Sequence, residues 1–240
     1  MRTKTLALAS AAALAAVVTA SADTTVQAKA ANVIDLVQKA EVSAARQSWT
    51  AAIDAYKQAV AENAKDPVLR NKLGICYQRA GDAKQARKAY KKAIELRKDY
   101  AEAWNNLGTL EHARNRYKQA ISHYAKAIQA KPADAVFHKN LGVAWLALGN
   151  VDEAAEAWNE AYRIDPAFLA SQAVAVPADG VSLARQDYLY AKLLAAHGQT
   201  EKALEYLVKA HAQGFHDFAR VEGDKDFASL VTDPRYAALK

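Results

Sequence analysis

The chain has 240 residues, of which 52% are hydrophobic and 24% are charged, and its formal net charge is +6. This composition excludes an intrinsically disordered protein, because disordered chains have too few apolar residues to build a core. The single cysteine, Cys76, excludes an internal disulfide, and we expect it to be an inert packing residue rather than a nucleophile.

Residues 1–22 have the pattern of a secretory signal peptide. Arg2 and Lys4 precede an uncharged apolar run that ends in small residues suited to cleavage. The sequence therefore predicts an exported protein, periplasmic or secreted, with a linker over residues 23–32. Cleavage after Ala30 is an alternative, and an uncleaved leader could act as a weak membrane anchor.

A 34-residue period follows the linker. Glycines recur at this step as Gly74, Gly108 and Gly142, and alanines and aromatic residues keep the same step at fixed distances after them. Large and small residues alternate at i, i+3, i+4 and i+7, which is the stripe of an amphipathic helix, and each unit has room for two helices. The sequence therefore predicts four helical hairpins, over residues 33–66, 67–100, 101–134 and 135–168.

The predicted turns and helix starts have suitable residues. Gly81, Asn115 and Gly149 lie between the two helices of a hairpin, where a positive φ is needed. Asp66 and Asp134 lie where a helix N-cap is wanted.

Two stretches of the third hairpin resemble the tetratricopeptide repeat (TPR) family. They are the run Trp104, Asn105, Asn106, Leu107, Gly108 and the spaced set Ala120, Tyr124, Ala127, Pro132. The resemblance implies an all-α fold, a right-handed α-solenoid of about five hairpins with a C-terminal capping helix. It also implies a non-catalytic module that binds a protein or peptide partner in a concave groove.

The 34-residue step breaks after Pro166. We interpret residues 169–183 as an insertion, either a connector or a loop that contacts a partner, and residues 184–217 as a fifth repeat. Residues 218–240 leave the repeat pattern and carry apolar side chains that could cover the last hairpin. We therefore expect them to form a cap.

The resemblance places the groove along the first helix of each hairpin. Asn106 and Asn140 lie at equivalent positions, two before a glycine, and such amides can hold a peptide backbone. Packing between repeats is the alternative explanation for these amides. The lysine and arginine side chains among the predicted groove residues could also bind a carboxylate. The predicted groove residues are Asn71, Lys72, Arg79, Asn105, Asn106, Thr109, Lys139, Asn140, Tyr188 and Lys192.

Charge is distributed unevenly along the repeats. Residues 67–100 carry ten Lys and Arg against three acids, a local +7, and residues 135–168 carry two against five, a local −3. The positive charge of residues 67–100 includes a basic ridge on the predicted second helix of that hairpin. The ridge is formed by Lys84, Arg87, Lys88, Lys91 and Lys92. This ridge is a solvated face, or it makes weak contact with a membrane surface or an acidic partner. We expect no nucleic acid partner, since an aromatic stacking platform is missing.

The sequence contains no catalytic or phosphate-binding motif, and its six histidines lack metal-ligand spacing. We expect neither an enzyme nor a cofactor or metal. His123 is expected on the solvated surface and His138 at a packing position. The leading hypothesis is an exported adaptor that binds peptides or proteins in its concave groove. Its alternatives are a self-assembling homo-oligomeric scaffold held by opposite charges and an accessory subunit of an envelope enzyme complex.

Overall fold

The computed structural model describes residues 26–169 and 180–240. The predicted signal peptide and most of the predicted insertion lie outside the described residues. Residues 26–32, which we expected to be a linker, are helical. Every regular element in the described ranges is a helix, which confirms the all-α fold. No helix among these residues combines the length and apolarity needed to span a membrane.

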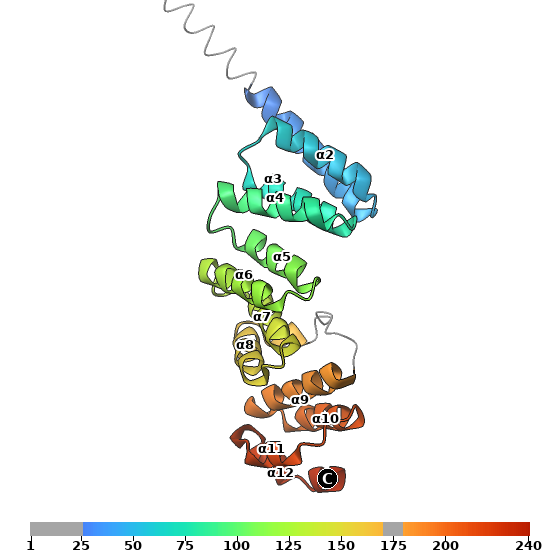
Figure 1. Cartoon of the computed structure of the whole chain (residues 1–240), viewed down its shortest axis with the longest axis vertical. Helices are drawn as coiled ribbons and strands as arrows, with labels where there is room; N and C mark the ends of the chain where they lie inside the picture. Colours follow the sequence, from blue (N-terminus) through green and yellow to red (C-terminus); the bar gives the residue numbers. More distant parts are fainter. Residues whose placement is uncertain (1–25, 170–179) are drawn as a thin grey trace, which may run out of the picture. The chain divides into compact units, whose positions relative to one another are not determined.

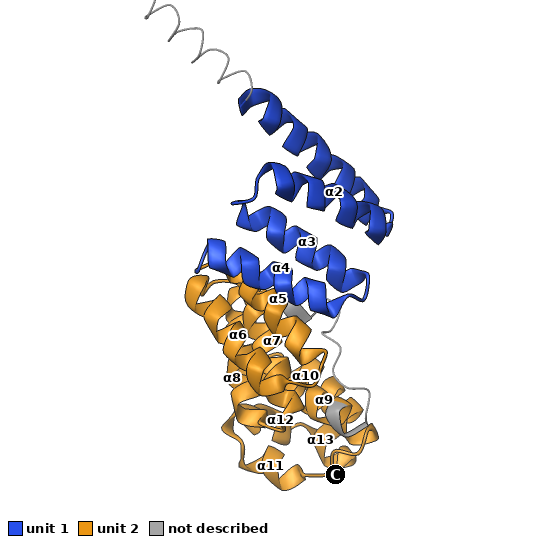
Figure 2. Cartoon of the chain, turned by 45° about the horizontal axis from the view of Figure 1, so that its top comes forward, with its two compact units in different colours: residues 1–98 blue, residues 99–240 orange. Residues whose placement is uncertain are grey.

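The chain divides into two compact units, Met1–Lys98 and Asp99–Lys240, called unit 1 and unit 2 (Figure 2). Unit 1 has a helix over residues 26–45 and three labelled helices (Figure 1). These are α2 (Trp49–Glu62), α3 (Pro67–Arg79) and α4 (Ala83–Leu96). They form the first two hairpins.

Unit 2 contains the remaining three hairpins and the C-terminal segment. The hairpin helices are α5 (Ala101–His112), α6 (Tyr117–Ala130), α7 (Ala135–Ala147), α8 (Val151–Ile164), α9 (Gly180–Ala196) and α10 (Thr200–Ala212). The short helix η1 (Pro166–Leu169) follows α8. The C-terminal segment contains α11 (Phe218–Gly223), η2 (Lys225–Phe227), α12 (Ala228–Val231) and α13 (Pro234–Leu239).

The periodic glycines face aromatic rings inside their own hairpins. A Cβ atom at Gly108 would lie 2.6 Å from Cε1 of Tyr124, and one at Gly142 would lie 2.3 Å from Cδ1 of Trp158. Both rings are almost completely buried. Because such distances are too short for carbon atoms, the two helices pack this closely only while the glycine lacks a side chain. The period in the sequence is therefore a packing period.

The turns of the hairpins have the conformation that their residues favour. Gly81 and Gly149 both have φ of 83°, and Asn115 has φ of 58°. These values confirm the predicted left-handed turns. Gln47 holds the same position in the first hairpin with φ of 57°, although glutamine gives no sequence signal for it.

The predicted N-caps are also present. The Asp66 side chain accepts hydrogen bonds from the backbone nitrogens of Val68 and Leu69, at 2.7 and 3.3 Å. Asp134 accepts one from the nitrogen of Val136 at 3.2 Å. These bonds satisfy amide groups that a helix N-terminus leaves without a partner.

The C-terminal segment caps the last hairpin. Phe227, Leu230 and Tyr236 are buried in one cluster with residues of α9 and α10, including Leu189 and Leu207. The cap consists of short helices rather than a single one, since Asp224 and Asp233 each begin a new helix as its N-cap. Without the C-terminal segment, the apolar face of the last hairpin would be exposed to water.

Candidate functional site

The first helices of two hairpins in unit 2 bring two predicted groove amides together. The side-chain nitrogen of Asn140, on α7, donates a hydrogen bond of 2.8 Å to the side-chain oxygen of Asn105, on α5. Asn105 is half-buried, and Asn140 is 9% exposed. We call these two residues the amide pair.

The amide pair keeps hydrogen-bonding capacity. Among the described residues, the Asn105 side-chain nitrogen has no acceptor and the Asn140 side-chain oxygen has no donor. One free donor beside one free acceptor matches the carbonyl and amide groups of a peptide backbone. Thr109, one turn further along α5, donates to the backbone oxygen of Asn105 at 3.1 Å and accepts from the Tyr124 hydroxyl at 3.3 Å. Thr109 therefore links the backbone of α5 at Asn105 to α6, while the bond within the pair orients the two amides.

The residue that contacts Asn140 differs from the one its repeat position suggests. Asn106 is the repeat equivalent of Asn140, but the bond runs to Asn105. Equivalent side chains on parallel neighbouring helices point the same way and are separated by about 8–10 Å, the spacing of packed helix axes. A direct bond needs a side chain that leans toward the next helix, and Asn105 satisfies this condition. Asn106 is half-buried beside the pair and has contacts of its own.

Lys139 lies next to the amide pair but is largely buried. Its side chain is 8% exposed, and burial lowers its pKa. Its backbone oxygen accepts a hydrogen bond of 3.1 Å from the indole nitrogen of Trp158. Lys139 thus helps to hold α7 against α8, and little of it is available to a carboxylate ligand.

Two predicted groove residues of α9 serve the cap instead. Tyr188 is 2% exposed, and its ring lies with its centroid 5.7 Å from that of Phe227 in the cap. The Lys192 ammonium lies 2.6 Å from Asp224 and 3.7 Å from Asp226, both in the cap. These contacts join α9 to the C-terminal segment, so neither side chain lies in an open groove.

The remaining groove residues belong to unit 1. Asn71 is buried with contacts of its own, and Lys72 forms an ion pair with Glu41. Arg79, at the end of α3, is exposed. Cys76 is 3% exposed, as predicted for a packing residue, and burial raises the pKa of its thiol.

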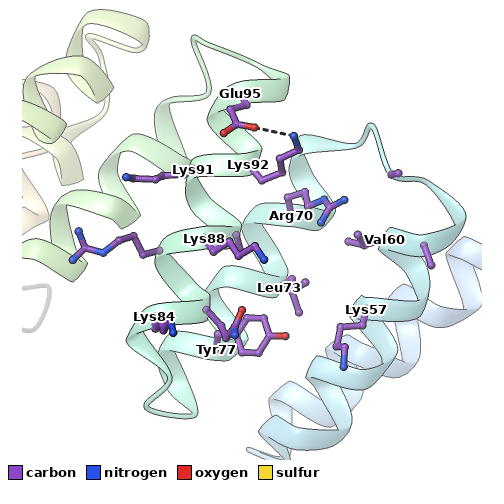
Figure 3. Close-up of a pocket in the computed structure, with 15 residues that line it drawn as sticks. Lys57, Val60, Arg70, Leu73, Tyr77, Lys84, Lys88, Lys91, Lys92 and Glu95 are labelled. Carbon is purple, nitrogen blue, oxygen red and sulfur yellow. Dashed lines mark hydrogen bonds and ion pairs between the residues drawn. The ribbon is translucent and has the colours of Figure 1, made fainter.

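The predicted basic ridge forms one wall of a cleft in unit 1 (Figure 3). The cleft has a volume of about 890 Å³ and is lined by residues of α2, α3 and α4. Lys57 on α2 and Arg70 on α3 add two cations that sequence analysis did not connect to the ridge, because they come from other helices. We call this feature the basic cleft.

The histidines are dispersed among packing contacts. His123, which we expected on the solvated surface, is half-buried and stacks on Trp104 with 5.6 Å between the ring centroids. His138 is hydrogen-bonded to the backbone oxygen of Pro132 at 2.8 Å. In the ranges that the structure describes, no three His, Cys, Asp or Glu side chains gather into a metal site.

Two family models described as tetratricopeptide repeat match the chain, over residues 65–133 and 111–174. The matched region includes the amide pair and the ridge. No curated protein matches the sequence.

Several solved structures share the fold. PilF of Pseudomonas aeruginosa is 19% identical with a TM-score of 0.59, and the match covers 88% of this chain and 90% of that one. A MamA structure is 22% identical with a TM-score of 0.55, over 76% of this chain and 91% of the other. YrrB, described as a TPR protein with an unusual peptide-binding site, is 19% identical with a TM-score of 0.51, over 79% and 90%.

Proposed function

Since the chain belongs to the tetratricopeptide repeat family, we propose that it is an exported, non-catalytic adaptor that holds an extended segment of a partner protein against α5 and α7. The family in general consists of protein-interaction modules. The observation that carries the proposal is the amide pair, which keeps one donor and one acceptor side by side.

This arrangement favours recognition of backbone rather than of side chains. The Asn105 nitrogen can donate to a peptide carbonyl while the Asn140 oxygen accepts from a peptide amide. The bond within the pair orients the two amides before a partner arrives, so less conformational entropy is lost on binding. Half-buried Asn106 adds polar surface beside them.

The test compares partner recovery by the wild-type chain and by Asn105→Ala/Asn140→Ala in extracts of the producing cells, with a photoreactive residue at position 106. We expect one crosslinked protein to be lost in the double variant. Each lost hydrogen bond is worth about 1 kcal/mol, so the affinity should fall roughly tenfold or more.

Gln129→Ala is the matched control, because it removes an exposed amide from the second helix of the same hairpin. Circular dichroism establishes that each variant is folded. Once the crosslinked segment is identified, N-methylation of the peptide bond next to the crosslink should weaken binding. Unchanged recovery by the folded double variant would contradict a role for the amide pair.

Export rests on the leader pattern of residues 1–22 and has its own test. The mass of the protein purified from the periplasm or the medium should correspond to a chain that begins at Asp23, or at Ala31 for the alternative cleavage. A chain that retains Met1 and stays in the cytoplasm would exclude export while leaving the binding proposal intact.

A further inference from the structure

The basic cleft is a second surface of unit 1 with features that suit a ligand. Lys57 and Val60 of α2 lie across it from α3 and α4 (Figure 3). The floor contains apolar groups of Leu73 and Tyr77 on α3. The cleft therefore combines an apolar floor with a cationic rim.

The charge of the rim is strongly one-sided. Seven cationic side chains line the cleft against one carboxylate, Glu95, which already accepts a hydrogen bond of 2.8 Å from Lys92. The Nε atom of Arg70 is buried and has no hydrogen-bond partner among the described residues. A buried donor without an acceptor is costly, and its position on a side chain that lines the cleft favours an anionic ligand there.

The cations are spaced like the residues of one helix face. Lys84, Lys88 and Lys91 lie at i, i+4 and i+7 on α4, which spreads them over about 10 Å at a rise of 1.5 Å per residue. A single anionic lipid headgroup can pair with only part of this row of lysines. A helix with acidic residues at the same spacing can pair with all three lysines and has room for apolar residues on its other side.

We propose that the basic cleft binds an acidic amphipathic helix of a partner protein, with its apolar side chains on the floor and its carboxylates on the ridge. The site is distinct from the amide pair, which lies in unit 2 and would bind extended backbone. The two sites can therefore be tested separately.

Other occupants fit the cleft less well. A bilayer surface reaches the rim cations but not a recessed apolar floor. The segments 1–25 and 170–179 of this chain contain one acid each, Asp23 and Asp179. A second copy would offer the acids of α8, but that helix has no large apolar residue among the exposed ones in the described ranges.

The probe for this proposal is a fluorescein-labelled helical peptide with Glu at i, i+4 and i+7 and Leu on the opposite face. Its binding to the purified full chain is followed by fluorescence anisotropy. We expect saturable binding that weakens as salt rises, and a loss of roughly tenfold or more with Lys88→Glu/Lys91→Glu. Versions of the probe with Gln for Glu, or with Ser for Leu, should both bind more weakly.

Lys39→Glu/Lys118→Glu is the matched control, because it changes net charge equally at exposed positions outside the cleft. It should alter the affinity less than twofold, a threshold of roughly 0.4 kcal/mol. Equal loss in both double variants would mean non-specific attraction and overturn the proposal. Binding of phosphatidylglycerol vesicles but not of the peptide would also overturn it, as would equal affinity for the Ser version of the probe.

Discussion

At the residue scale, the glycine on the first helix of the second, third and fourth hairpins is a packing requirement that can be measured. Gly108→Ala would place a methyl group 2.6 Å from the Tyr124 ring, which is 2% exposed and has little room to move. Alanine gains about 1 kcal/mol in helix propensity, but overpacking at so short a distance costs about 2–3 kcal/mol, the upper part of its usual range. We expect a net loss of about 1–2 kcal/mol in the free energy of unfolding, measured by chemical denaturation.

The tyrosine offers an internal control. In a Tyr124→Leu background the ring is gone, so the same alanine substitution should cost little or even stabilise the chain. Gly223→Ala is a second control, since nothing lies within 4 Å of a Cβ atom there. Equal costs with and without the ring would show that helix contact at Gly108 is not the cause.

His112, at the end of α5, should make stability depend on pH. Its ring packs on Tyr117 with 5.1 Å between centroids, and its Nε2 atom is buried without a partner in the described part of the chain. Burial lowers its pKa below 6.5, so in mildly acidic solution the unfolded chain binds a proton that the folded chain resists. Stability should therefore fall as the pH drops below 6.5.

The measurement compares the thermal midpoint of the wild type and of His112→Gln across this pH range. The variant should lose less stability between pH 6.5 and the folded pKa, whereas above 6.5 the difference between the two should be constant. Parallel curves throughout would mean that His112 is protonated equally in the folded and unfolded chains.

At the scale of elements, the cap should be an integral part of unit 2. Phe227 has no exposed surface and its ring centroid lies 5.7 Å from that of Tyr188 on α9. Phe227→Ala should lower the free energy of unfolding by about 3–5 kcal/mol, as is typical of buried phenylalanine. A fluorescent dye that binds apolar surface should also report the newly exposed face of α9 and α10.

Lys225→Ala, an exposed substitution in the same short helix, should change stability by only about 0.5 kcal/mol or less. If Phe227→Ala behaves like this control, the cap is a loosely attached appendage and the buried cluster does not stabilise the hairpin.

Local patterns explain which elements could be predicted. The hairpins, the turns at Gly81 and Asn115 and the helix N-cap at Asp66 follow from short sequence spacings, because their causes act within one or two helical turns. Tyr188 and Lys192 match groove positions by register, yet Phe227 and Asp224, which contact them, come from the cap, whose packing direction no repeat pattern encodes. The amide pair depends on how one helix leans toward the next, and the basic cleft on cations from three helices.

At the scale of the whole molecule, the uneven charge bears on self-association. Residues 67–100 carry +7 and residues 135–168 carry −3, which favours attraction between copies. Two of the acids on α8 are already engaged, since Asp152 lies 2.9 Å from Arg220 and Glu160 lies 2.9 Å from Arg163. Exposed ion pairs contribute only about 0–1 kcal/mol each, and salt weakens them.

We therefore expect the chain to be monomeric at physiological salt, with weak association at most in dilute buffer. A stable dimer of standard size buries about 1,600 Å² with an apolar centre, and α8 exposes no large apolar side chain within the described ranges that could supply one. Light scattering across a salt series measures this directly, with Lys88→Glu/Lys91→Glu as a variant that weakens the attraction. A salt-resistant oligomer would favour the scaffold hypothesis over the adaptor, because charge alone could not hold it.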